Sequence, residues 1–353
     1  GPWTQRYVMK IGNSHYMSPI QFNDKAGNYG AYHPEHWAAD GTPTSPNNSW
    51  ERRCAGCHAT GVNLAWDETT GEYLTGYAQL NLGCEACHGG GEAHVASQNP
   101  NDILNPRDLM DGTVAGVQAA DLTCGQCHNR GSGEKPMDGA TEAPSGTGYP
   151  WNATTGIFPP GVGPDTFWTD YYTEGTGQYF LEKDNPMGFA PTADRSDDTW
   201  VASKKHHQQY LDLHQGPHAP DKGYDGACFD CHDPHANKDR KHMVAKTINR
   251  SGNTYTDIEN DNNKICLACH NGHGDFENVT STDVNDITDT FAPASVAPAV
   301  VDHMTDQAAM PIPLAAYDPA GDATGRCSKC HMPKTSKSAV YTTDKAGHQV
   351  GDI

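Results

Sequence analysis

The sequence Cys-x-x-Cys-His occurs six times in this chain, and the six copies use all 12 of its cysteines. On a helical turn, residues i, i+3 and i+4 share one face, so both thiols and the imidazole of each copy point the same way. This pattern is the attachment motif of c-type haem, in which the thiols bond the porphyrin and the histidine binds the iron. We therefore predict six covalently attached haem c groups, with cofactor-binding cysteines and proximal metal-binding histidines at Cys54, Cys57 and His58; Cys84, Cys87 and His88; Cys124, Cys127 and His128; Cys228, Cys231 and His232; Cys266, Cys269 and His270; and Cys327, Cys330 and His331.

Zinc binding is the alternative interpretation of these cysteines, because three zinc sites with four cysteine ligands each would also use all 12. Zinc, however, gives no reason for a histidine to follow every second cysteine. Since the six motifs leave no cysteine over, the sequence excludes disulfides and iron–sulfur clusters.

The composition is poor in the apolar residues that a conventional core requires. Only 35% of the 353 residues are hydrophobic, and the mean hydropathy is -0.72. Six porphyrins would supply the missing apolar surface. The 37 glycines and 24 prolines favour turns and short helices over long elements. We expect a multihaem cytochrome fold, mostly irregular, with short α-helices wrapped around a haem chain and little β-structure.

The formal charge is -20 before cofactors, and haem propionates make it more negative. This charge argues against nucleic acid and anionic membrane surfaces as partners. The longest apolar stretch, residues 291–301, is too short to cross a bilayer, so we expect no transmembrane segment. Because thioether attachment takes place outside the cytoplasmic membrane, and no signal sequence precedes Gly1, we expect a targeting segment that was removed or omitted. The predicted location is extracellular or at the cell surface, with the periplasm as second choice.

The uneven spacing of the motifs divides the sequence into three parts. Residues 1–135 form an N-terminal lobe with three haems, residues 136–199 a haem-free insert rich in aromatic residues, glycine and proline, and residues 200–353 a C-terminal lobe with three haems. The aromatic residues between Phe167 and Phe180 form either a docking surface or a lid packed on haem edges.

The clearest helical pattern runs from Trp200 to Gln215 and ends at Gly216 and Pro217. One face of this predicted helix would carry His207 among apolar residues, directed at an iron. An adjacent face would carry His206, so the sequence leaves open which of the two histidines is the ligand. No sustained alternation predicts a large sheet. The residues on the first face are His207, Tyr210, Leu211 and His214.

The second axial ligand of each iron separates an electron-transfer protein from an enzyme, because only a five-coordinate iron can bind a substrate. Thirteen histidines remain after the six proximal ones, and this surplus favours bis-histidine ligation. Met243, Met304 and Met332 are secondary candidates, and a histidine near a haem could instead bond a propionate, most readily His33, His36, His214 or His242. As distal ligands we expect His94, His207, His218, His235, His273 and His303, with His15, His36, His206 and His348 in reserve.

His235 and His273 each follow a proximal histidine by three residues. Two intervening residues cannot reach around a porphyrin to the opposite face of the same iron. If these histidines are ligands, they therefore bind a neighbouring haem, which would hold adjacent haems in near contact.

Several runs of sequence resemble multihaem cytochromes related to the tetrahaem cytochrome of ammonia oxidisers. The resemblance covers more than half of the chain but not the aromatic insert. It implies that the haem at Cys54 to His58 is five-coordinate, that His206 or His207 ligates the haem at Cys84 to His88, and that His94 serves a haem attached upstream. The runs are Arg53 to Gly61, Leu82 to His94, Cys124 to Gly131, His206 with His207, and Cys327 to Lys334.

Since no haem motif lies upstream of Cys54, His94 either is reassigned within the chain, reaches a haem of a neighbouring molecule, or belongs to a sequence trimmed from a longer protein. The second option resembles the joints of extracellular cytochrome filaments. We expect an exported conductor of electrons to redox proteins or extracellular acceptors, which could self-associate through inter-subunit histidine ligation. The alternatives are an oxidoreductase acting on small nitrogen compounds at Cys54 to His58, and a monomeric periplasmic shuttle.

Overall fold

A computed structural model of the chain describes residues 4–24, 27–129, 149, 179–181, 200–203, 207–236, 243–259, 262–288, 291–306, 325–332, 337–343 and 349–352. Three histidines considered above, His206, His242 and His348, lie outside the described residues. The aromatic segment of the insert also lies outside them, except for the backbone of Tyr179 and Phe180.

The described chain divides into two compact units, each with three of the six motifs. The first unit comprises Gly1–Phe180, Ser203–Asp225 and Thr335–Ile353, and the second comprises Leu181–Ala202 and Gly226–Lys334. This division differs from the sequence-based one in placing residues 203–225 with the N-terminal motifs. The reason is local packing, because helix α7 (Gln209–Gln215) contacts helix α5 (Val114–Gly125).

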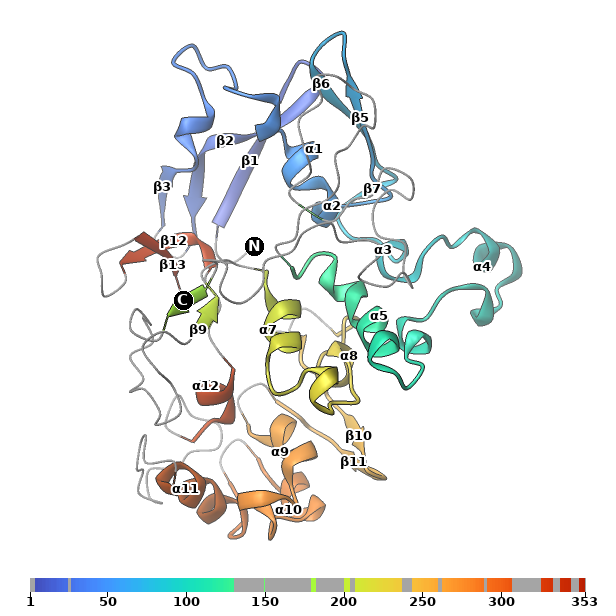
Figure 1. The fold of residues 1–353 in the computed structure, drawn as a ribbon, viewed down its shortest axis with the longest axis vertical. Helices are drawn as coiled ribbons and strands as arrows, with labels where there is room; N and C mark the ends of the chain where they lie inside the picture. Colours follow the sequence, from blue (N-terminus) through green and yellow to red (C-terminus); the bar gives the residue numbers. More distant parts are fainter. Residues whose placement is uncertain are drawn as a thin grey trace. The chain divides into compact units, whose positions relative to one another are not determined.

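An antiparallel sheet of three strands begins the first unit (Figure 1). It consists of β1 (Thr4–Ile11), β2 (Ser14–Asn23) and β3 (Asn28–Ala31), with β2 in the centre and Ile11 paired with Ser14 at the tight end. From Ser14 to Ser18, every second side chain of β2 is buried. Two of these three buried residues are serines, so hydropathy alone does not reveal the alternation, and the sequence did not predict the sheet.

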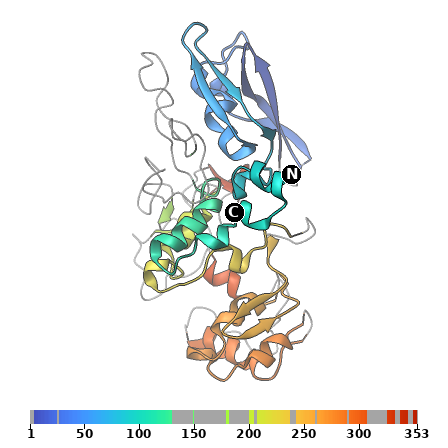
Figure 2. The same cartoon turned by 90° about the vertical axis from the view of Figure 1, so that its right-hand side faces the viewer.

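Two short antiparallel pairs follow, and the one that begins at Asn63 lies beside the three-stranded sheet, with its second strand in contact with β2 (Figure 2). In the outer pair, β4 (Ala59–Thr60) pairs with β7 (Gln79–Leu80), and in the inner hairpin β5 (Asn63–Asp67) pairs with β6 (Glu72–Gly76). The first motif packs its cysteines against the apolar cluster that these strands build. The buried members of this cluster are Trp50, Ala55, Ala59, Val62, Leu64, Trp66, Tyr73 and Tyr149.

The remaining elements of the first unit are short helices, as the composition predicts. Side-chain caps begin several of them: Ser49 accepts from the N–H of Arg52, and Thr113 accepts from the N–H of Gly116 at the start of α5. The helices are η1 (Pro34–His36), η2 (Pro46–Asn48), α1 (Trp50–Arg53), α2 (Ala55–His58), α3 (Glu85–His88), α4 (Glu92–Ser97), η3 (Pro100–Asp102), η4 (Pro106–Leu109), α5, α7 and η6 (Pro220–Lys222). In addition, strands β12 (Lys337–Thr343) and β13 (Gln349–Asp352) form an antiparallel pair in this unit.

The helix expected from Trp200 to Gln215 is wrong in its first half. Residues Trp200–Ser203 form strand β9, preceded in the chain by strand β8 (Tyr179–Leu181), and α7 begins only at Gln209. His207 has a φ of 62°, in the left-handed region, which no residue inside a right-handed helix adopts. His207 therefore does not share a helical face with Tyr210 and His214.

The second unit is a set of short helices and one hairpin around its own apolar core (Figure 1). Its elements are α8 (Cys228–Cys231), β10 (Ile248–Arg250), β11 (Asn253–Tyr255), α9 (Lys264–His270), η8 (Gly274–Phe276), α10 (Ser281–Asn285), α11 (Val296–Asp306) and α12 (Cys327–His331). The core includes Leu267 and Ala268, which lie inside the fifth haem motif. Among the described helices of the whole chain, none is long and apolar enough to cross a membrane.

Candidate functional site

Each Cys-x-x-Cys-His motif forms one helical turn, as its spacing predicts. In four motifs, the backbone N–H of the histidine donates to the carbonyl of the first cysteine over 2.9–3.1 Å: His58 to Cys54, His88 to Cys84, His128 to Cys124 and His232 to Cys228. The last two motifs lie wholly within helices α9 and α12. All six copies therefore have the backbone that brings two thiols and an imidazole to one face.

The thiols of the three motifs in the first unit lie close together. The Cys57 thiol contacts that of Cys127, and this contact, together with burial, raises the pKa of Cys127 well above its usual range. Burial, with Cys124 and Cys84 nearby, raises the pKa of Cys87. The three attachment points of this unit are thus neighbours, although their motifs are well separated in sequence.

The second unit repeats this arrangement. The Cys327 thiol contacts the thiol of Cys266, and this contact and burial raise the pKa of Cys266 well above its usual range. Burial, with Cys269 and Cys266 nearby, raises the pKa of Cys231 to about 12. Motifs four, five and six therefore also bring their attachment points together.

Two proximal histidines are oriented by hydrogen bonds at Nδ1, which leaves Nε2 as the ligand atom. His88 Nδ1 lies 2.7 Å from the carbonyl oxygen of Leu104, and His128 Nδ1 lies 3.1 Å from Oε1 of Gln209. Such a partner fixes the tautomer and ring orientation of a metal-binding histidine. Burial, with a smaller effect from Arg6, lowers the pKa of His58, so its imidazole is neutral and able to bind a metal at neutral pH.

Two of the expected distal histidines face a proximal histidine. The ring centroids of His128 and His207 lie 6.0 Å apart, edge to face, and those of His303 and His331 lie 5.9 Å apart with 30° between the planes. Two imidazoles on opposite sides of one metal ion, with bonds of about 2 Å and roughly 1 Å from nitrogen to ring centre, have centroids ~6 Å apart. The centroid distances of both pairs match this length.

The resemblance had implied that His206 or His207 ligates the haem at Cys84 to His88. The ring of His207 lies instead beside His128, the histidine of the third motif. The same segment supplies Gln209, whose Oε1 lies 3.1 Å from His128 Nδ1, so two residues of one short stretch of chain lie beside this motif histidine.

His303 and His94 are also held at Nδ1. His303 Nδ1 lies 2.6 Å from Oδ2 of Asp275, and the ring packs against Phe276. His94 Nδ1 lies 2.9 Å from the carbonyl oxygen of Asn99 on a half-buried face of α4. In both histidines the Nε2 atom is the one available to an iron.

The other expected distal ligands lie on the surface. His218 packs edge-on against Tyr224. His235 is 78% exposed, and its backbone N–H donates to Asp233. His273 is exposed at the start of η8. The ligand roles of His218, His235 and His273 stay predictions.

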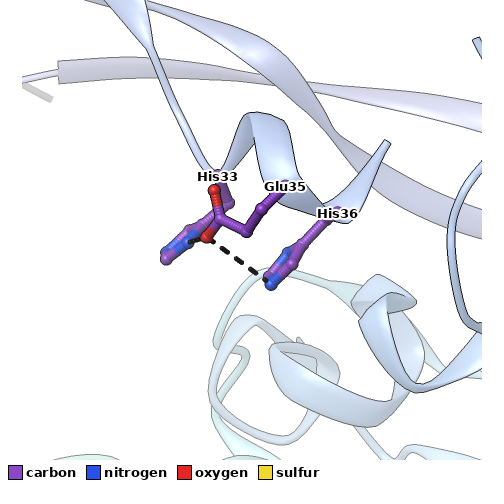
Figure 3. A group of neighbouring side chains, drawn as sticks. All are labelled: His33, Glu35 and His36. Carbon is purple, nitrogen blue, oxygen red and sulfur yellow. Dashed lines mark hydrogen bonds and ion pairs between the residues drawn. The ribbon is translucent and has the colours of Figure 1, made fainter. Parts of the chain in front are cut away.

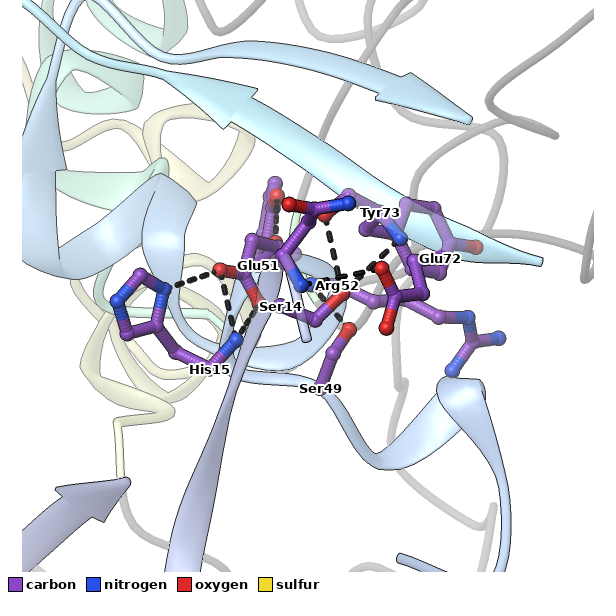
Figure 4. Close-up of polar contacts among 9 residues, drawn as sticks. Ser14, His15, Ser49, Glu51, Arg52, Glu72 and Tyr73 are labelled. Atoms are coloured by element: carbon purple, nitrogen blue, oxygen red, sulfur yellow. Dashed lines mark hydrogen bonds and ion pairs between the residues drawn. The ribbon is translucent and has the colours of Figure 1, made fainter. Parts of the chain in front are cut away.

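Sequence reasoning missed a buried carboxylate next to the first motif. Glu51 is only 2% exposed, and its carboxylate accepts the backbone N–H of His15 through both oxygens at 3.0 Å and lies 2.7 Å from His15 Nδ1 (Figure 4). Ser14 ties the same segment to the backbone of Tyr73, and Tyr149 donates its hydroxyl to the Glu51 carbonyl. No local signal marks Glu51, because it lies on helix α1 and its partner His15 lies on strand β2, 36 residues away in the chain.

His214 has a structural role. Its Nε2 lies 3.0 Å from Oδ2 of Asp121, which is fully buried in α5, and its ring packs on Tyr210 at 4.3 Å. Because the usual ligand atom is occupied, His214 fastens α7 to α5. The non-ligand role considered for His214 was a hydrogen bond to a haem propionate, whereas its partner in the structure is Asp121.

Comparison with known proteins identifies the neighbourhood of the first two motifs. Residues 24–89 match the family described as cytochrome c554 and c-prime. This segment contains Cys54 to His58 and Cys84 to His88, and the match confirms the resemblance to multihaem c-type cytochromes. A match to a cytochrome c family implies covalently bound haem c.

Two solved structures are similar to the chain at low identity. The outer cell wall cytochrome OcwA is 20% identical, with a TM-score of 0.45 over 76% of this chain and 53% of its own. An undecahaem cytochrome from the S-layer of Carboxydothermus ferrireducens is 18% identical, with a TM-score of 0.36 over 94% of this chain and 44% of its own. The chain thus spans about half the length of either protein. No curated protein matches it.

Proposed function

We propose that the chain is an exported hexahaem c-type cytochrome that conducts electrons along closely spaced, mainly bis-histidine haems. Haem c, when bound, supplies reversible one-electron exchange at its iron. The chain supplies twelve thiols and six proximal imidazoles on six helical turns, and it groups the attachment points of each unit. The proximity of these thiols is the observation that supports a conduit best, because electron transfer requires neighbouring cofactors.

The two histidine pairs support conduction rather than catalysis. We assign His207 as the distal partner of His128, and His303 as the distal partner of His331. An iron held between two imidazoles has no open position for a substrate. These histidines would therefore hold the iron and transfer no proton to a substrate. The hydrogen bonds of Gln209 to His128 and of Asp275 to His303 would adjust the reduction potential of each iron.

The test is spectroscopic and uses the purified holoprotein. We expect ferric haems that are low-spin, and a reduced form that binds no carbon monoxide. A high-spin ferric signal together with carbon monoxide binding by the reduced protein would favour the enzyme, with the haem at Cys54 to His58 as the reactive one. Film voltammetry should then show whether all haems exchange electrons over one continuous range of potentials.

Extracellular location and self-association belong to the same proposal. His94 supports a ligand swap between copies, because Asn99 holds its Nδ1 and the ring is only half-buried. Sedimentation at rising concentration tests this: wild type should assemble, and His94→Ala should stay monomeric with one haem changed to high spin. Monomers at every concentration would favour the periplasmic shuttle.

A further inference from the structure

The one-turn helix η1, which follows β3, gathers two imidazoles and a carboxylate from outside the six haem motifs (Figure 3). The donor atoms of His33, Glu35 and His36 all lie within 4.8 Å of one another. Oε1 of Glu35 lies 2.7 Å from Nδ1 of His33 and 4.0 Å from Nε2 of His36. A single carboxylate oxygen therefore lies between the two rings.

The backbone fixes the two rings on the same side of the turn. Their centroids are 4.7 Å apart and their planes differ by 8°. His33 has a φ of 46° and a ψ of 54°, a left-handed conformation that costs free energy in a residue other than glycine. Pro34 then starts the turn, and the N–H of His36 donates to the His33 carbonyl over 3.0 Å.

Hydrogen bonds anchor the far end of the turn as well. The indole N–H of Trp37 donates to the carbonyl of Met17 in β2 over 3.2 Å, and the N–H of Thr44 donates to the carbonyl of His36 over 2.9 Å. The backbone that carries the three donor groups is therefore tied to the sheet, and little ordering is needed when a ligand binds.

This group is arranged differently from the histidine pairs assigned to iron. In those pairs the centroids lie about 6 Å apart, as opposite axial positions require. The nearly parallel rings of His33 and His36 at 4.7 Å are too close to enclose one iron between them. The carboxylate of Glu35 lies beside both rings, whereas a bis-histidine haem iron has no carboxylate ligand.

We propose that His33, Glu35 and His36 bind a divalent transition-metal cation of the zinc type, separate from the haem irons. Two imidazoles and one carboxylate, with one position left for water, form an established zinc ligand set. A tetrahedral site with bonds of 2.0–2.1 Å places its ligand atoms roughly 3.3 Å apart. The Glu35–His36 distance of 4.0 Å therefore has to shorten by ~0.7 Å, and the Glu35–His33 distance of 2.7 Å has to lengthen by ~0.6 Å as the metal replaces the hydrogen bond. The Glu35 side chain is 63% exposed and can make this movement by rotation.

The experiment titrates the holoprotein with zinc chloride by calorimetry and counts retained zinc after desalting. Wild type should retain one zinc ion more than the double variant His33→Gln/His36→Gln. Glu35→Gln should weaken the tightest site by at least about tenfold. The matched control Glu68→Gln changes an exposed glutamate elsewhere in the same unit and should bind zinc as wild type does.

Two results would overturn the proposal. One is equal zinc retention by wild type and the double variant. The other is loss of a low-spin haem signal in the double variant, because it would assign His33 or His36 to an iron. An unchanged haem spectrum together with the loss of one zinc ion would support the site.

Discussion

The imidazoles of His128 and His207 face each other with 6.0 Å between their centroids, although they come from opposite sides of the long interval between motifs. Two further contacts bind these segments: His128 Nδ1 to Gln209, and the N–H of Tyr210 to the His128 carbonyl. The left-handed φ of His207 turns the chain just before α7. The third motif and its proposed distal ligand are therefore held together by the fold itself.

Replacing His207 by glycine should change a single haem. His207→Gly should convert one low-spin ferric haem to high spin and let the reduced protein bind one equivalent of carbon monoxide, because one axial position opens. Electron paramagnetic resonance and carbon monoxide titration measure both effects. His214→Gln is the control, since the Nε2 of His214 bonds Asp121. A spectrum of His207→Gly identical to that of wild type would exclude His207 as a ligand.

Removing the charge of Asp275 should raise the reduction potential of one haem. Its carboxylate accepts from His303 Nδ1 over 2.6 Å and makes the imidazole a stronger donor, which favours ferric iron. In a spectroelectrochemical titration, Asp275→Asn should shift one potential upward by roughly 20–60 mV, where 59 mV is tenfold in the equilibrium constant. The exposed Asp286→Asn should shift none. A downward shift in Asp275→Asn contradicts the assignment.

Lys264 should be important for stability of the second unit. Its side chain is 3% exposed, and its Nζ donates to the carbonyls of Thr256 and Asn285 over 3.0 and 2.8 Å. Lys264→Ala removes the charged donor of both carbonyls from a buried position, at a cost of about 2–4 kcal/mol in the free energy of unfolding. Guanidinium unfolding measures the loss, and Lys246→Ala at an exposed position serves as control. Equal midpoints for the two variants would refute this role.

Gly56 should not tolerate a methyl group. A Cβ at this position would lie 2.2 Å from the ring of Tyr149, which is buried. Gly56→Ala should lower the free energy of unfolding by about 1–3 kcal/mol through overpacking, even though alanine favours helix over glycine. Gly76→Ala, where a Cβ meets nothing within 4 Å, is the matched control. Thermal unfolding of both variants measures the difference. A higher melting temperature for Gly56→Ala than for wild type would show that the space between residue 56 and the Tyr149 ring accommodates a methyl group.

The first unit should lose stability in alkali through Tyr73. Burial raises the pKa of Tyr73 to about 12, against an opposing effect of the nearby Arg52 guanidinium. The folded-state pKa exceeds the ordinary value of about 10, so the folded protein favours the neutral phenol more than the unfolded chain does. The stability that depends on this neutral phenol is fully present below pH ~10 and is lost as the pH rises towards 12. Chemical denaturation at several pH values should show a shallower decline for Tyr73→Phe. Parallel curves for variant and wild type would argue against Tyr73 as the source.

The sequence predicted the chemistry of the motifs better than the fold around them. A fixed spacing of cysteines and histidine specifies a helical turn, and each of the six turns is present. The distal-ligand roles of His207 and His303 stay predictions; the structure adds that their rings lie beside His128 and His331, pairings that the sequence could not assign. Such pairings depend on contacts such as Gln209 with His128, which no local pattern encodes.

The parts that the sequence did not reveal depend on buried polar residues. Strand β2 buries Ser14 and Ser18, so its alternation is invisible in hydropathy. The contact of His15 with the buried carboxylate of Glu51 joins two elements far apart in the chain. The helix expected from Trp200 fails because Trp200–Ser203 pair as strand β9 and His207 has a left-handed φ.

The proposed hexahaem cytochrome is tested most directly by the number of its haems and their covalent attachment. Intact mass under denaturing conditions, together with a pyridine haemochrome assay of the same sample, counts the covalently bound haems. We expect a mass increase of six haem groups and a spectrum of haem c bonded through two thioethers at each motif. Fewer than six haems, or cysteines that retain zinc instead of porphyrin, would contradict it.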